Sequence, residues 1–420
     1  MNSIIVVGAG QTAVSVVLKM RKNGYGGKIT IIGDENKPPY QRPPLSKKYL
    51  TGEVPEEKLY LRTQQVYDDL DIEMRLGIKV VLIDRASKQL LLSDAEKLPY
   101  DKLVLATGAR PRNLPDSIKG DFQNVYTFRT LDDARKLRSI MTTGQRILII
   151  GGGYVGLEMA AVASTLNLEV TVVEMCDRIL QRVASTLTAD YFKSLHSNHD
   201  VDICEGVSLR KLEGSGNRAD IAVMSDGSAV GVDIIIVGIG VVPNIELARN
   251  AGLPVDNGIL VDEHCRTFDP NIFAAGDCAS FPYNGVQIRL ESVPNAIAQG
   301  EHVADIICDI ATKPYVPLPW FWSDQYDVKL QIAGLNTGYT DAIIRKNDHS
   351  DLQSVWYFKN QSLLAVDAIN DVKSFMQGKK WLKAGISPDP TKIAQSNISF
   401  SECLVPVIHH QSAVLEPNKD

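Results

Sequence analysis

Short hydrophobic runs alternate with helix-like stretches along the first two thirds of the chain. An apolar run at residues 4–7 is followed by a glycine-rich turn, a helical stretch to about Asn23 and a second apolar run at 29–32. Apolar runs of this length next to glycine are typical of buried strands, so the order predicts a βαβ unit. The same pattern returns later, with strand-like runs at 147–150 and 170–173 around an alanine-rich helical stretch. We therefore expect two similar βαβ units.

The segments between and after these units predict the domain organisation. A stretch rich in Pro, Gly, Asp and Lys near residues 112–122, and Val-Pro-Asn at 242–244, indicate crossings between domains. The last hundred residues carry Trp320, Trp322 and Trp356 but no glycine-rich turn, which favours a separate α+β domain. A chain of 420 residues also exceeds the roughly 250 to 300 residues of a single core. The expected domains are 1–112 with 244–319, 113–243, and 320–420.

Composition excludes several classes of function. Lys and Arg number 44 against 50 Asp and Glu, and this net charge of -6 argues against a general nucleic-acid or anionic-membrane binder. The longest apolar runs are strand-sized and no leader precedes the first one, so we expect a cytoplasmic protein. The six cysteines form no Cys-x-x-Cys pair, and we expect neither a metal site nor a vicinal redox disulfide.

The first glycine turn has the spacing of a dinucleotide site. It reads Gly8-x-Gly10-x-x-Ala13 between a predicted strand and a predicted helix. Glycines allow a tight turn and let the backbone approach a pyrophosphate, whose charge then lies at the helix N-terminus. Asp34 follows the next strand, where a carboxylate can accept hydrogen bonds from ribose hydroxyls. An ordinary strand-helix turn is the alternative interpretation.

The second glycine turn indicates a nicotinamide dinucleotide. Gly151, Gly153 and Gly156 have the same spacing, and Glu174 ends the following strand. An acidic residue at this position favours a free ribose 2′-hydroxyl and repels the extra phosphate of NADP, so NADH is predicted. Arg178 and Arg182 follow closely and leave phosphate binding open as an alternative.

Two dinucleotide folds in one chain permit a chemical inference. Nicotinamide gives up electrons as a hydride, metal centres accept them one at a time, and a flavin can do both. The pattern therefore predicts an electron converter that binds non-covalent FAD as well as NADH.

Five further segments resemble one family, the oxygenase-coupled NADH-dependent ferredoxin reductases. They are the segments YQRPPLSK at 40–47, LATGARP at 105–111, IFAAGDC at 272–278, ESVPNA at 291–296 and PWFWSDQ at 319–325. The resemblance implies an α/β, glutathione-reductase-like fold with two Rossmann-type dinucleotide-binding domains and a C-terminal α+β domain. It further implies a flavoprotein oxidoreductase that passes single electrons to a 2Fe-2S ferredoxin, which supplies a cytochrome P450 monooxygenase or a Rieske dioxygenase.

The resemblance and the two spacings together give the expected cofactor contacts. For FAD they are Gly8, Gly10, Thr12, Ala13, Asp34, Arg42, Lys47, Val80, Ala106, Thr107, Gly108, Arg129, Asp277, Val293 and Trp320. For NAD they are Gly151, Gly153, Tyr154, Val155, Gly156, Glu158, Glu174, Arg182, Gly238, Ile239 and Gly240. For Arg129 the alternative is a surface ion pair, since such pairs are common.

Lys47 and Glu158 are the expected catalytic pair. By the resemblance they meet beside the flavin and the arriving nicotinamide, where the ion pair can position the nicotinamide and tune the flavin. The alternative is an ion pair with a structural role alone. In related disulfide-type enzymes a redox cysteine occupies the position of Lys47, so a thiol relay at this position is excluded.

The expected partner is an acidic ferredoxin bound by a monomer or weak homodimer. Basic residues can attract it by electrostatic steering, and Trp322 lies in a segment that the resemblance places near the flavin. The basic candidates are Arg289, Lys379, Lys380 and Lys383. Two other functions stay open: a rubredoxin reductase, and a redox-sensing flavoprotein resembling apoptosis-inducing factor.

Overall fold

The computed structural model describes residues 3–310, 313–346 and 352–404, which form two compact units. The first unit ends at Leu330 and the second begins at Gln331. The first therefore includes β23 (Trp320–Gln325), which the expected domain limits assign to the C-terminal domain. Those limits stay a prediction.

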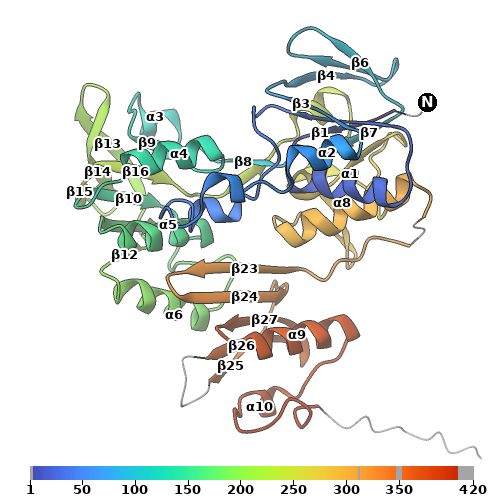
Figure 1. The fold of residues 1–420 in the computed structure, drawn as a ribbon. Helices are drawn as coiled ribbons and strands as arrows, with labels where there is room; N and C mark the ends of the chain where they lie inside the picture. Colours follow the sequence, from blue (N-terminus) through green and yellow to red (C-terminus); the bar gives the residue numbers. More distant parts are fainter. Residues whose placement is uncertain (1–2, 311–312, 347–351, 405–420) are drawn as a thin grey trace, which may run out of the picture. The chain divides into compact units, whose positions relative to one another are not determined.

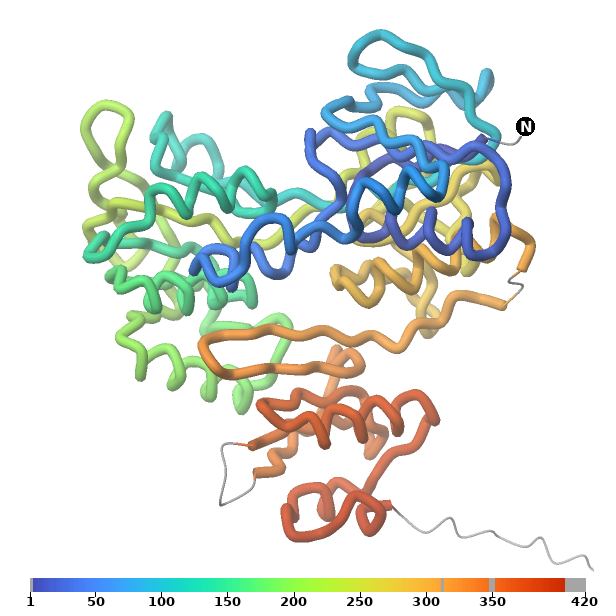
Figure 2. Tube along the Cα trace, in the orientation of Figure 1, coloured from blue at the N-terminus to red at the C-terminus, as the bar shows by residue number. Residues whose placement is uncertain are grey.

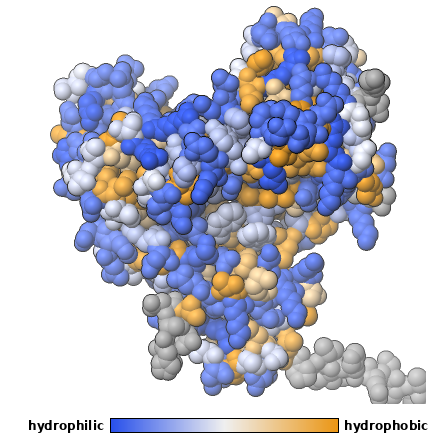
Figure 3. Space-filling view, in the orientation of Figure 1, coloured by the Kyte–Doolittle hydropathy of each residue, from blue (hydrophilic) through white to orange (hydrophobic). Residues whose placement is uncertain are grey.

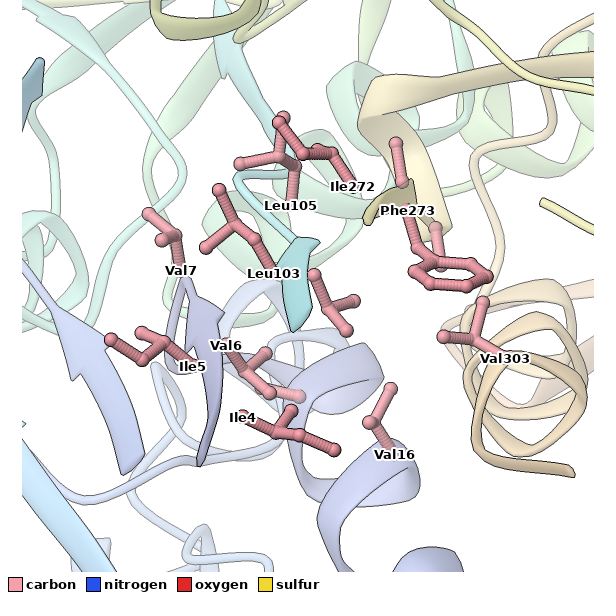
Figure 4. Packing of buried hydrophobic residues seen from close by; sticks show 14 of the residues in the cluster. Ile4, Ile5, Val6, Val7, Val16, Leu103, Leu105, Ile272, Phe273 and Val303 are labelled. Carbon is pink, nitrogen blue, oxygen red and sulfur yellow. The ribbon is translucent and has the colours of Figure 1, made fainter. Parts of the chain in front are cut away.

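The first βαβ unit forms the centre of a parallel sheet (Figure 1). Its order is β20-β7-β1-β2-β3, from β1 (Ser3–Val7), β2 (Lys28–Gly33), β3 (Ile72–Leu76), β7 (Lys102–Leu105) and β20 (Ile272–Ala274). Helices α1 (Gln11–Lys22) and α8 (Val293–Ile307) pack against each other, and a Cβ on Gly300 would lie 2.8 Å from the Thr12 carbonyl oxygen. Figure 4 shows Val16 and Val303 from these helices facing the apolar side chains of the sheet.

The second βαβ unit forms a second parallel sheet in the same compact unit. Its order is β12-β11-β10-β16-β9, from β9 (Val125–Thr127), β10 (Arg146–Ile150), β11 (Glu169–Glu174), β12 (Asp202–Glu205) and β16 (Ile234–Val237). The accompanying helices are α4 (Leu131–Ile140), α5 (Tyr154–Thr165) and α6 (Thr186–Ser197). Burial of all four residues of β16 explains its unbroken apolar sequence.

Two crossings join the folds that carry these sheets. β8 (Ala109–Pro111) and β17 (Val241–Pro243) pair antiparallel, so both crossings run side by side. Beside them the Thr107 hydroxyl donates to the Asn244 carbonyl at 2.7 Å, and the Asn244 amide donates back to the Thr107 carbonyl at 2.8 Å.

Shorter elements complete the first unit. The antiparallel strands are β4 (Val80–Asp84), β5 (Gln89–Leu92), β6 (Lys97–Pro99), β13 (Leu209–Ser215), β14 (Arg218–Met224), β15 (Ala229–Gly231), β18 (Val255–Asp256), β21 (Ala279–Tyr283) and β22 (Val286–Ile288), with β19 (Gly258–Leu260) parallel to β21. The short helices are η1 (Pro43–Ser46), η2 (Glu56–Lys58), η3 (Gly276–Cys278), α2 (Gln64–Asp69), α3 (Asp116–Lys119) and α7 (Glu246–Asn250).

The second unit is an α+β structure. Four strands of one sheet lie in it or extend into it, in the order β24-β27-β26-β25: β24 (Val328–Gly334), β25 (Asp341–Lys346), β26 (Gln353–Lys359) and β27 (Ser362–Ile369). Its helices are α9 (Val372–Ala384) and α10 (Pro390–Ile393). The rings of Trp356 and Trp381 lie 5.5 Å apart in its core, and Phe400 packs on both. Trp356 therefore has a packing role.

One face of the molecule is shown with its side chains in Figure 3. On the face visible in Figure 3, hydrophilic residues predominate and hydrophobic ones lie in separate groups between them. Among the described residues, no helix has the length and apolar character needed to cross a bilayer.

Candidate functional site

Both predicted glycine turns require glycine for steric reasons. Gly8 and Gly151 have positive φ angles of 112° and 109°. A Cβ on Gly8 would lie 2.1 Å from the Ala106 carbonyl oxygen, and one on Gly151 would lie 2.5 Å from the Gly238 carbonyl oxygen. Each turn thus passes directly over the end of a neighbouring strand, as a dinucleotide-binding turn does.

The helices that follow these turns present free space at their N-termini. α1 begins after Gly10 and α5 after Gly153, and neither helix has a side-chain cap or an acidic residue in its first turn. A Cβ on Gly10 or Gly153 would meet no heavy atom within 4 Å. By contrast, Thr130 caps α4 through a reciprocal bond with Asp133. Uncapped amides with space before them fit the pyrophosphates of FAD and NAD.

The acidic residues at the strand ends differ in environment. Glu174 accepts hydrogen bonds from the amides of Gly152 at 2.8 Å and Cys176 at 2.9 Å, which fixes its carboxylate beside the second glycine turn. At the first turn Asp34 is exposed, whereas its neighbour Glu35 is already bonded to other side chains. Glu174 is thus held at the second turn, where a dinucleotide ribose would lie, and the ribose contact of Asp34 stays a prediction.

Arg42, Arg129 and Asp277 come together although they are far apart in the sequence. Arg129 pairs with Asp277 at 2.8 Å, and Arg42 donates to the Arg129 carbonyl at 2.9 Å. Gly276 packs against the first helix, because a Cβ there would lie 2.3 Å from the Thr12 hydroxyl. The Arg129–Asp277 pair is half-buried beside Gly108. Arg129 therefore forms an ion pair, as its alternative interpretation expects, and its contact with FAD stays a prediction.

Lys47 and Glu158 form a largely buried ion pair. Their charged atoms lie 2.9 Å apart, with 14% of the Lys47 side chain and 5% of the Glu158 side chain exposed. The short helix η1, which ends directly before Lys47, contacts α5, which carries Glu158, and Figure 2 shows this blue segment beside the green helix. Removing one partner of a buried pair typically costs about 3–5 kcal/mol, because the other charge is left uncompensated. The pair joins the two dinucleotide folds.

Two serines that sequence analysis missed complete the shell of Glu158. The Ser46 hydroxyl donates to one carboxylate oxygen at 2.7 Å, and the Ser323 hydroxyl donates to the other at 2.7 Å. Ser46 belongs to the YQRPPLSK segment and Ser323 to the PWFWSDQ segment, which are two of the segments that carry the family resemblance. Nothing in the sequence indicated that they share one carboxylate with Lys47.

The aromatic segment lies on β23 and divides between its two faces. Trp320 and Trp322 alternate with Phe321, and their rings lie 5.7 Å apart. Phe321 packs on Tyr154 of α5 with ring centroids 5.1 Å apart. Strand alternation thus directs Phe321 and Ser323 toward α5 and leaves the tryptophans on the other face.

The other predicted cofactor residues differ in how far they are exposed. The buried ones are Thr12, Ala13, Val80 and Gly156, the half-buried ones are Ala106, Thr107, Gly108, Val293, Gly238 and Ile239, and the exposed ones are Val155, Arg182 and Gly240. Arg178, which also follows Glu174, is bonded to the carbonyls of Ile179 and Ala184. No contact places Arg182 at the glycine turn.

The predicted partner residues fall into two groups. Lys380 and Lys383 are exposed on α9, and half-buried Lys379 lies over the Phe375 ring at 5.2 Å. Arg289 differs, since only 9% of its side chain is exposed and it pairs with Glu291 and donates to the Asp277 carbonyl. Its charge is compensated, so the expectation that Arg289 steers a partner from the surface is corrected to a role beside Asp277.

The described residues contain no cluster of three or more His, Cys, Asp or Glu side chains suited to a metal ion. None of the described cysteines forms a disulfide, and burial raises the pKa of Cys265 to about 12.

Two families of known proteins match this chain. The pyridine nucleotide-disulphide oxidoreductase family matches residues 2–300, and the reductase C-terminal family matches residues 320–404. Rhodocoxin reductase of Rhodococcus erythropolis is 41% identical, covering 95% of this chain and 93% of its own. Putidaredoxin reductase of Pseudomonas putida is 38% identical, covering 96% of this chain and 97% of its own.

A solved structure has the same fold. The crystal structure of the covalent putidaredoxin reductase–putidaredoxin complex matches with a TM-score of 0.92 and 38% identity, covering 96% of this chain and 98% of that one. This match confirms the glutathione-reductase-like fold class, and the family implies the use of FAD and NAD(H). The chain belongs to the pyridine nucleotide-disulphide oxidoreductase family.

Proposed function

We propose that this protein is an FAD-dependent NADH:ferredoxin oxidoreductase. One NADH and two oxidised 2Fe-2S ferredoxins give NAD⁺, two reduced ferredoxins and one proton. Bound FAD supplies the conversion from a hydride to single electrons. The ferredoxin in turn supplies a cytochrome P450 monooxygenase or a Rieske dioxygenase. The near full-length similarity to rhodocoxin and putidaredoxin reductases supports this proposal.

One observation in the structure carries the proposal. Lys47 stands after the first dinucleotide turn and Glu158 on the helix of the second, and they pair at 2.9 Å in a largely buried place. The pair thus links the two cofactor sites, and we propose that it positions the nicotinamide over the flavin. Ser46 and Ser323 hold Glu158 by hydrogen bonds from two sides.

We propose that NADH is the natural donor. Both oxygens of the Glu174 carboxylate are bonded to backbone amides, so its negative charge is fixed beside the second glycine turn. A 2′-phosphate would meet this charge, whereas a free ribose hydroxyl can donate to it.

The decisive experiment measures electron acceptors. The purified protein is expected to be yellow, to be reduced by NADH much faster than by NADPH, and to pass electrons to acidic 2Fe-2S ferredoxins. Rubredoxins and cytochrome c serve as comparison acceptors, because a rubredoxin reductase would prefer the former. A redox sensor resembling apoptosis-inducing factor would instead consume little NADH with every acceptor and change its oligomeric state. A colourless protein that takes up no FAD would contradict the proposal.

We propose that α9 helps to attract the ferredoxin. Lys380 and Lys383 are exposed on this helix together with apolar Val372 and Met376. Such a mixed basic and apolar face suits an acidic protein with a small docking surface. The monomeric or weakly dimeric state and the cytoplasmic location stay predictions.

Reversing the charge of Lys380 and Lys383 is expected to raise KM for ferredoxin by about tenfold at low ionic strength, with kcat little changed. The dependence of KM on salt should flatten, because steering charges act on the rate of encounter. The control is Lys359→Glu at the end of β26, compared with the single variant Lys380→Glu, so that both change the net charge equally on an exposed lysine. Equal effects of control and variant would show that net charge alone matters.

A further inference from the structure

A chain of buried polar side chains extends from Glu158 to helix α6. The Ser323 hydroxyl lies 2.7 Å from a Glu158 oxygen, the Gln325 amide nitrogen 3.2 Å from the Ser323 oxygen, and His196 Nε2 2.8 Å from the Gln325 amide oxygen. Glu158 is 4% exposed, and the other three are fully buried. Such groups are costly to bury unless each one is hydrogen-bonded.

The direction of these hydrogen bonds follows from the chemistry of Glu158. A carboxylate only accepts, so the Ser323 hydroxyl must donate to it and accept from the Gln325 amide group. The Gln325 amide oxygen then faces His196, whose Nε2 must carry a hydrogen. The ring nitrogen Nδ1 of a neutral imidazole accepts, and the Tyr326 hydroxyl lies 3.2 Å from it. All donors in the chain therefore point toward Glu158.

The surroundings of His196 favour the neutral ring that this direction requires. Burial lowers the pKa of His196 to about 4, and its hydrogen bond to Gln325 and the nearby His199 ring are lesser influences. Tyr326 is the other titratable group against the ring, and burial raises its pKa to about 12. A neutral imidazole with one N–H can hold only one orientation of the Gln325 amide.

We propose that His196 is a positioning residue for Glu158. Its Nε2–H fixes the amide orientation of Gln325, which fixes the Ser323 hydroxyl, which in turn holds the Glu158 carboxylate in place against Lys47. This inference rests on the proposed function, because it concerns the same Lys47–Glu158 pair.

Replacing His196 by a residue without an imidazole removes the hydrogen bond that fixes the orientation of the Gln325 amide. Without the Nε2–H, the Gln325 amide can turn over and present its oxygen to Ser323. The Ser323 hydroxyl then donates to Gln325 instead of Glu158, and one carboxylate oxygen loses a buried hydrogen bond. The expected result is a displaced Glu158 and weaker positioning of the nicotinamide.

The first test reads the hydrogen bonds directly and needs no turnover. Nitrogen-15 spectra of histidine-labelled protein should show His196 as a neutral ring with hydrogen on Nε2, unchanged when the pH is lowered to about 5, well below the ordinary histidine pKa. A ring protonated at Nδ1, or one that titrates near the ordinary pKa, would overturn the proposal.

The second test measures NAD⁺ binding to the oxidised holoenzyme through the flavin absorption spectrum. We expect His196→Leu to raise the dissociation constant by about threefold to tenfold, the effect of one buried hydrogen bond. His196→Gln, whose amide can donate from the position of Nε2, should restore most of the affinity. In a Ser323→Ala background, His196→Leu should have almost no further effect, because the intermediate link is gone.

The control is His199→Leu, in the turn that directly follows α6. The His199 ring stacks on Tyr326 at 3.7 Å, but its Nδ1 is bonded to the Leu195 carbonyl and it is no member of the chain. It should leave NAD⁺ affinity unchanged. An undiminished effect of His196→Leu in the Ser323→Ala background would overturn the proposal and leave the proposed function intact. A wild-type protein that binds neither FAD nor NAD⁺ would instead contradict the proposed function. The histidine spectra would still test the hydrogen bonds from His196 through Gln325 and Ser323 to Glu158.

Discussion

Replacing Lys47 with methionine is expected to slow flavin reduction by NADH by about 100-fold in stopped-flow measurements. Methionine has a similar length but no charge, so Glu158 keeps only its bonds from Ser46 and Ser323. Its carboxylate, with 5% of the side chain exposed, then lies almost uncompensated where we propose that the nicotinamide docks. A misplaced nicotinamide delivers hydride slowly even when NADH is bound.

The neighbouring residue offers a matched control. Lys48 is exposed in the same loop, and Lys48→Met makes the same change in charge and shape away from Glu158. This variant should reduce at the wild-type rate. The double variant Lys47→Met with Glu158→Gln removes both charges and should recover part of the loss, since no buried charge remains. If Lys47→Met is reduced as fast as the wild type, Lys47 has no part in hydride delivery.

The sequence predicts the two dinucleotide folds because their signals are local. Each buried strand is an unbroken apolar run, and each turn requires glycine within a few residues of it, as at Gly8 and Gly151. These features depend on neighbouring residues along the chain, so spacing alone reveals them. The pairing of Lys47 with Glu158 was expected only through the family resemblance, and the structure brings the two together.

The polar contacts around Glu158 could not be predicted in this way. They depend on how β23 lies against α5 and α6, which places Ser323 and Gln325 on the facing side. A shift of one residue along the strand would turn Trp322 toward α5 and both polar residues away. His196 carries no local sign of its role, because its partner Gln325 is 129 residues away in the sequence.

Charge gave the least reliable prediction from sequence. The sequence alone groups Arg289 with the lysines of α9, because it does not distinguish a largely buried guanidinium from an exposed one. In the structure its charge is compensated by Glu291, and its side chain is 9% exposed. An arginine two residues before an acidic residue, in a segment rich in apolar positions, fits such a local pair better than a steering charge.

Substitutions at Gly156 and Gly153 of the second turn are expected to differ in effect: the first should lower both stability and NADH affinity, and the second NADH affinity alone. A Cβ on Gly156 would lie 2.0 Å from the Gly151 carbonyl oxygen, which is backbone and cannot move aside cheaply. Gly156→Ala should therefore push α5 away from the turn, destabilise this fold by about 1–3 kcal/mol and weaken NADH binding by about 100-fold. The first fold is untouched, so the protein should stay yellow and still be reduced by dithionite.

Gly153→Ala is the matched variant with the same added methyl group. A Cβ there would meet no protein atom within 4 Å, so the melting temperature should equal that of the wild type. The methyl group nevertheless occupies the approach to the α5 N-terminus, and NADH affinity should fall by about tenfold. Calorimetry and NADH titration of both variants give two independent measurements. Wild-type affinity in Gly153→Ala would mean that the pyrophosphate does not lie against this helix, since a methyl group cannot share that space with a phosphate oxygen.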